Sequence, residues 1–132
     1  MPSRESQKSK VNPRQVNEYV RQALAYAAER AESGYAEIVP TLAAQNLGLS
    51  SVEALAVLMV LEDAGALKHH YRIYCRPSDG VLADVESKKD VERLIYCKFC
   101  DKNHGEEDLN VELVFRIIPD GLNKLLSDRA VA

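Results

Sequence analysis

Metal-binding side chains fall close together in the segment CKFCDKNH, residues 97–104, of a chain that contains only three cysteines. Cys97 and Cys100 have the C-x2-C spacing in which a tight turn directs two sulfur atoms at one ion. His104 follows soon after, within reach of the same ion. Structural zinc sites favour four Cys or His ligands that turns of this kind bring together. The segment therefore predicts three ligands of a structural Zn2+ site: Cys97, Cys100 and His104.

The fourth ligand has to come from another part of the chain. Cys75 is the only remaining cysteine, and it ends an alternating segment beside a turn. We predict that Cys75 completes the site, with Asp79, His69 and His70 as alternatives. Two interpretations without a metal stay open: a C-x-x-C redox pair, and buried free thiols.

Catalysis is not predicted at this site. A catalytic zinc needs an open coordination position and a general base in a cleft. Glu106, Glu107 and Asp108 follow the cysteines, but three consecutive carboxylates in a turn are typical of solvated surface. The sequence contains no Ser/His/Asp set, Gly-rich phosphate loop or H-E-x-x-H pattern. We therefore expect a protein that is not an enzyme and has no small-molecule substrate.

The composition is that of an ordinary globular protein, with 132 residues, 46% hydrophobic and 28% charged. This length suits one domain or two very small ones. The longest nearly uncharged stretch, residues 53–62, is far too short to span a membrane. The N-terminal residues are polar and basic, without the apolar region of a secretory signal. These features predict a cytoplasmic protein, and a reducing compartment favours metal over disulfide.

Periodicity and capping signals divide the chain into a helical part and a β part. Asn12 and Pro13 predict the start of a long helix, which Gly34 ends. Ser50 and Glu53 predict a capping box at the start of a later helix, which Gly65 ends. The predicted elements are helices at 13–33, after Pro40, at 51–64 and after 121, a short strand or turn at 35–39, and strands at 67–75, 81–85, 93–96 and 110–118.

This order resembles a winged helix-turn-helix, and the residues that carry the resemblance are TLAAQNLGLSSVEALAVLMVLEDAGALKHHYRIYC. The resemblance implies a three-helix core with a β wing, which most often binds DNA through its third helix. We therefore expect an α+β fold. The expected parts are a disordered basic arm at 1–11, a winged helix-turn-helix at 12–85, a zinc-binding β hairpin module at 86–119 that shares Cys75 from the wing and resembles a zinc ribbon, and a C-terminal tail or short helix at 120–132.

The charge pattern argues against groove reading by the third helix. Residues 31–67 contain no Lys or Arg, whereas helices that read DNA bases need basic or amide side chains. We expect Val52, Leu55, Leu58 and Met59 to face the core. Ala54, Val57 and Leu61 then lie nearer the outside, where an acidic and apolar surface suits a protein partner. The alternative is that this helix is simply more buried than usual.

DNA binding is the alternative function, because positive or titratable side chains gather on the predicted wing. These residues are Lys68, His69, His70, Arg72 and Arg76. The N-terminal arm adds Arg4, Lys8, Lys10 and Arg14, which suit phosphate contacts. A solvated, charged hairpin explains the wing residues equally well. The long Ala-rich helix also allows a homodimer.

Overall fold

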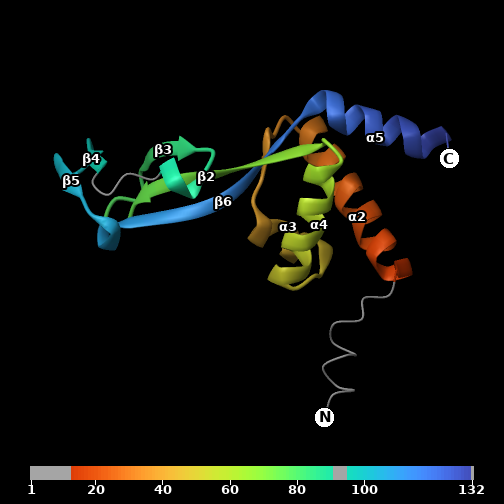
Figure 1. The fold of residues 1–132 in the computed structure, drawn as a ribbon, viewed down its shortest axis with the longest axis horizontal. Helices are drawn as coiled ribbons and strands as arrows, with labels where there is room; N and C mark the ends of the chain where they lie inside the picture. Colours follow the sequence, from red (N-terminus) through yellow and green to blue (C-terminus); the bar gives the residue numbers. More distant parts are fainter. Residues whose placement is uncertain (1–12, 91–94, 132) are drawn as a thin grey trace, which may run out of the picture.

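A computed structural model describes residues 13–90 and 95–131 of the chain. The predicted arm at 1–11 lies outside these residues. Helices gather at one end of the molecule, and a long β arm projects from them (Figure 1). The α+β prediction is confirmed. The elements are α2 (Pro13–Glu32), β1 (Glu37–Ile38), α3 (Pro40–Leu47), α4 (Ser51–Asp63), β2 (Leu67–Cys75), β3 (Val81–Val85), β4 (Ile95–Cys97), β5 (Lys102–His104), β6 (Leu109–Ile117) and α5 (Pro119–Val131), with short 3-10 turns at Lys88–Asp90 and Glu106–Asp108.

The boundaries of α3 and α4 follow local signals in the sequence. Pro40 occupies the first turn of α3, and Gly48 ends this helix with a φ of 67°. The capping box is confirmed: Glu53 N donates to Ser50 Oγ at 3.1 Å, and Ser50 N donates to Glu53 Oε1 at 2.9 Å. Among the described helices, none is by itself long and apolar enough to cross a membrane, and only α3 and α4 together, across a bend of 107°, have that length and composition.

The core lies where the helices cover one face of the sheet. Leu58 and Leu61 of α4 pack there with Phe115 of β6, and all three side chains are buried. Ile38 of β1 and Leu67 of β2 join them from the same face of the sheet. Because side chains alternate along a strand, the next residues of β2 and β6 point to the opposite face. The helices therefore cover one face of the sheet at the base of the β arm, and the opposite face points away from them.

The predicted outward face of α4 is wrong. Ala54, Val57 and Leu61 are buried in the core, whereas Val52 and Met59 are exposed. The helix is apolar on nearly every side from Val52 to Leu61, so the sequence offers no contrast between an inner and an outer face. Tertiary packing therefore decides which residues lie inside.

The four-stranded sheet has the order β1-β6-β2-β3, with every pair antiparallel. β3 pairs with β2 across the turn at residues 76–80. The segment around β6 was expected to belong to a separate zinc module, but β6 pairs with β2 along nine residues, from Leu67↔Ile117 to Cys75↔Leu109. The expected boundary at residue 85 therefore does not separate two sheets. Only the small sheet β4-β5 stands apart, at the far end of the arm (Figure 1).

A close backbone contact fixes the start of α5 against the turn between α4 and β2. Ile118 N donates to Ala66 O at 2.8 Å. One turn further on, a Cβ atom at Gly121 would lie 1.8 Å from the carbonyl oxygen of Gly65. Gly65 itself has a φ of 91°, which a side chain would oppose. Both glycines are thus required for this junction.

Candidate metal centre

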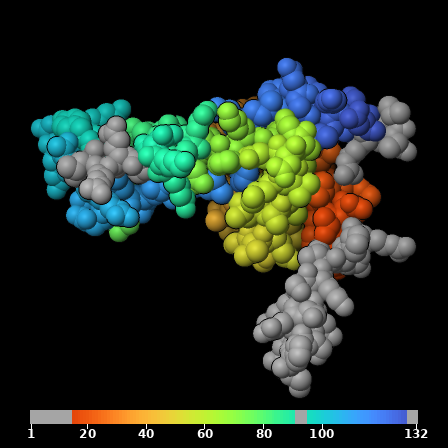
Figure 2. Space-filling view, in the orientation of Figure 1, coloured from red at the N-terminus to blue at the C-terminus, as the bar shows by residue number. Residues whose placement is uncertain are grey.

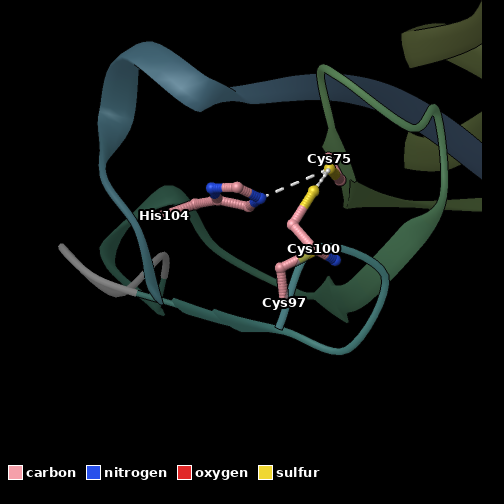
Figure 3. Close-up of side chains that lie close together, drawn as sticks. All are labelled: Cys75, Cys97, Cys100 and His104. Carbon is pink, nitrogen blue, oxygen red and sulfur yellow. Dashed lines mark hydrogen bonds between the residues drawn. The ribbon is translucent and has the colours of Figure 1, made fainter. Parts of the chain in front are cut away.

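Three separate segments bring Cys75, Cys97, Cys100 and His104 together at the tip of the arm (Figure 3). Cys75 ends β2, Cys97 ends β4, and His104 ends β5. One ligand atom from each residue lies within 4.8 Å of the others. This is the predicted set, with Cys75 as the fourth member. Asp79, His69 and His70 are not part of the cluster among the described residues.

Two separations between ligand atoms match those around a tetrahedral ion. Zinc bonds of about 2.3 Å to sulfur and about 2.0 Å to nitrogen require S–S separations of about 3.8 Å and S–N separations of about 3.5 Å. Cys75 Sγ lies 3.7 Å from Cys100 Sγ and 3.4 Å from His104 Nε2. These two separations fit a tetrahedral ion, and the remaining pairs of ligand atoms lie within 4.8 Å of one another.

Two turns with the same backbone geometry present the sulfur atoms. Asp79 N donates to Cys75 O at 2.7 Å, and Asp101 N donates to Cys97 O at 2.7 Å. Asp79 and Asp101 both have a positive φ, at 60° and 55°, which Asp tolerates better than most residues. The segments 75–79 and 97–101 are thus turns of equivalent backbone geometry.

Ser78 occupies the position in the first turn that Cys100 occupies in the second. Ser78 is not among the residues predicted from the sequence, although C-x-x-S-D at 75–79 parallels C-x-x-C-D at 97–101. The first turn therefore provides one sulfur atom where the second provides two. His104 supplies the remaining ligand atom.

Hydrogen bonds within the cluster shift the pKa values of two of its thiols. Burial by itself raises the pKa of the Cys75 thiol, but hydrogen bonds from the Ser78 hydroxyl and amide and from the other two cysteines outweigh it and lower the pKa to about 6. The hydrogen bond to Cys75 raises the pKa of the Cys100 thiol to about 11. Cys100 N also donates to Cys97 Sγ at 3.4 Å. The hydrogen bonds thus favour the thiolate form of Cys75 over that of Cys100, and a bound cation would favour deprotonation of the ligating thiols.

His104 is fully buried, so its ring nitrogens cannot turn to solvent. Its Nε2 faces Cys75, and its Nδ1 lies 3.5 Å from Asp108 Oδ2 without a direct hydrogen bond. A carboxylate beside the second nitrogen is common where histidine binds a metal, because it orients the ring. Nε2 points at the sulfur atoms, where a cation at the centre of the cluster would accept its lone pair. The residues present therefore fit a metal ion.

The five wing residues considered for nucleic-acid contact do not form one open patch. Side chains alternate along β2, so His69 faces α4 while His70 and Arg72 face the other side of the sheet. Each side chain already contacts an acceptor of this chain. These contacts are Lys68 with Glu86, His69 with Glu62, His70 with Glu37, Arg72 with Glu37 and Asp84, and Arg76 with Asn110. Four of these five side chains therefore lie beside a carboxylate, whereas Arg76 contacts neutral acceptors.

Comparison with protein-family models, with curated proteins and with solved structures finds no match for this chain.

Proposed function

We propose that the protein is a non-enzymatic interaction module with a winged-helix-like core. In this proposal, Zn2+ bound by Cys75, Cys97, Cys100 and His104 holds the tip of the arm, and the exposed face of α4 binds a protein partner. The exposed face of α4 carries this proposal. It presents Val52, Ala56, Met59 and Val60, of which Val52 is 78% exposed and Met59 is 54% exposed.

The spacing of these residues makes them one surface. Positions 52, 56, 59 and 60 follow the i, i+4, i+7, i+8 pattern of a single helix face. Glu53 and Asp63 are also exposed on α4, and the segment 31–67 contains no Lys or Arg. An apolar stripe beside carboxylates repels phosphate and gains free energy when a protein surface covers it. This face replaces the one predicted from the sequence.

The topology supports the winged-helix part of the proposal. Three helices precede the long antiparallel pair β2 and β6, and the short strand β1 between α2 and α3 joins β6 at the edge of the sheet. In this interpretation β2 and β6 are the wing strands. The segment that connects them is long, and it contains β3, the two cysteine turns and the small sheet β4-β5.

A structural role for the metal follows from the ligand set. Three sulfurs and one nitrogen in a tetrahedral arrangement are typical of Zn2+, and four protein ligands leave no open position for catalysis. The strands β4 and β5 have only three residues each and little core of their own. Such a small element needs an additional constraint, which a bound ion provides.

DNA binding is the less favoured function. The wing side chains are engaged with acceptors of the chain, and α4 offers no basic side chain for a groove. If the protein were a DNA-binding regulator, it would retard a mixed-sequence DNA duplex in a gel-shift assay at low salt, and its affinity for the duplex would fall steeply as salt rises. We expect no such shift.

The α4 face is tested by site-specific crosslinking. A photoreactive residue at Met59 should capture a discrete partner in cells, whereas the same residue at Ala25, an exposed position on α2, should not. With the purified partner, Met59→Glu should lower the affinity at least about tenfold, since it introduces a charge into an apolar contact. Ala25→Glu is the matched control. Equal crosslinking at both positions, or unchanged affinity for Met59→Glu, would overturn the proposal.

A further inference from the structure

The strand β6 has one edge that is largely unpaired. On one side β2 pairs with it along its whole length. On the other side β1 pairs only with Arg116 and Phe115, and no strand of the described residues continues this pairing toward Leu109. An edge of this kind presents unpaired amides and carbonyls, which readily accept another strand.

The register shows which backbone groups point to this edge. Arg76 N donates to Asp108 O at 2.8 Å on the β2 side, and Ile117 N donates to Ala36 O at 2.8 Å on the β1 side. Backbone groups of successive residues alternate between the two sides of a strand. The amides and carbonyls of even-numbered residues therefore face β2. Those of Val111 and Leu113 face the open edge.

A groove of about 770 Å3 runs beside the same edge. Residues 110–113 of β6 form one wall, and the starts of α3 and α4 form the other, through Pro40, Ser51 and Leu55. The groove lies at the inner corner where the arm leaves the helices, a concave region in Figure 2. The unpaired backbone groups and the groove thus coincide, which leaves room for an extended chain.

The lining of the groove indicates the side chains that such a chain would carry. Val111, Leu113 and Leu55 line it with apolar surface, and Val111 is 46% exposed. Glu112 and Asp79 also line it, and among the described residues no Lys or Arg does. Val111 and Leu113 point to one face of the sheet and Glu112 to the other. An added strand would therefore alternate apolar residues with Lys or Arg.

We propose that the open edge of β6 binds an extended, alternating apolar and basic segment of a partner protein as an additional strand of the sheet. A second copy of this chain is a poorer occupant. The antiparallel register that pairs Val111 with Leu113 of the second copy sets Glu112 opposite Glu112, and like charges directly opposite are destabilising. The residues of this edge differ from those of the exposed face of α4, so a failure of either proposal leaves the other untouched.

The test is a selection of nine-residue peptides from a random library against the full, metal-loaded chain. Enriched peptides should alternate apolar residues with Lys or Arg. The bound peptide should slow amide hydrogen exchange at Val111 and Leu113 at least about tenfold, because both amides then become hydrogen-bonded. Enrichment of acidic or non-alternating peptides, or exchange unchanged at these two amides, would overturn the proposal.

Two variants and one control sharpen the result. Val111→Pro removes an outward amide that β2 does not use, and it should abolish peptide binding, whereas Val111→Thr should retain it. Glu112→Lys should lower the affinity for a basic peptide at least about tenfold through charge reversal. Because exchange at Val111 and Leu113 is measured on the unaltered chain, poor folding of the proline variant would not rescue the proposal. Concentration-dependent protection of the two amides without peptide would identify a second copy as the occupant and overturn it.

Discussion

Single residues decide the chemistry at the tip of the arm. Cys75, Cys97, Cys100 and His104 form a closed set of donors, and the equivalent turns at 75–79 and 97–101 place the sulfur atoms. Much of this was predictable, since the C-x2-C spacing, His104 and the only other cysteine identify the four residues. Ser78 was not predictable in the same way. The parallel between C-x-x-S-D and C-x-x-C-D indicates its correspondence with Cys100, and the hydrogen bonds and positive φ angles of the two turns establish it.

This correspondence leads to a rescue experiment. Loss of a residue that only hydrogen-bonds to a metal ligand lowers metal affinity by roughly 10- to 100-fold. His104→Ala removes a ligand itself, so it should lower the zinc affinity by more than this. Adding Ser78→Cys should restore most of the affinity, because the first turn then supplies two sulfur atoms like the second. Competition with a chromogenic chelator measures both affinities. Ser33→Cys, which is exposed and far from the site in sequence, is the control. Failure of Ser78→Cys to restore the affinity would show that the two turns are not interchangeable. Equal rescue by Ser33→Cys would show that any added thiol suffices, which also contradicts the prediction.

The partner of His104 gives a second prediction at this scale. Asp108 Oδ2 lies 3.5 Å from His104 Nδ1, so its charge favours the orientation in which Nε2 faces the sulfur atoms. Asp108→Ala should therefore weaken zinc binding about 10-fold, within the range seen for such partners. Glu107→Ala removes a neighbouring exposed carboxylate and should change the affinity less than about twofold. Equal losses for both variants would indicate a general charge effect instead.

Among the elements, strand β6 is the one whose pairing differs most from the domain division expected from the sequence. Its alternating pattern predicts a strand but not its partner, and pairing with β2 joins two segments that looked like separate domains. Pairing depends on contacts between residues far apart in the chain, which a local pattern does not record. The exposed face of α4 was mispredicted for a related reason. Where nearly every residue from Val52 to Leu61 is apolar, only the neighbouring elements determine which side is covered.

The junction of α5 provides a stability test at this scale. Gly121→Ala places a methyl group against the carbonyl of Gly65, which is backbone and moves only with the turn. The free energy of unfolding should fall by about 1–3 kcal/mol, as for other overpacked sites. Asn123→Ala, at an exposed position of the same helix, should change it by less than about 0.5 kcal/mol. Denaturant unfolding measures both, and equal stabilities would mean that α5 does not dock as described.

In the whole molecule, the helical base and the tip of the arm depend on different interactions. Leu58, Leu61 and Phe115 belong to the core at the base, whereas the small sheet β4-β5 relies on its pairing and on the cysteine turns. Chelation of the metal should therefore accelerate amide hydrogen exchange at Tyr96 and Asn103 of that sheet by at least about tenfold. Exchange in α4 should change little, because local opening at the tip leaves the core intact. Uniform acceleration in both regions would mean that the metal holds the entire fold.

The central claim is that one zinc ion is bound by three sulfur atoms and one nitrogen atom at the tip of the arm. The most direct measurement is elemental analysis of the purified chain combined with X-ray absorption at the zinc edge. The account predicts one zinc per chain in an S3N environment, with zinc–sulfur distances of about 2.3 Å, and loss of the metal in Cys100→Ser. A metal-free protein with three free thiols and a tip as protected from exchange as the base would contradict it.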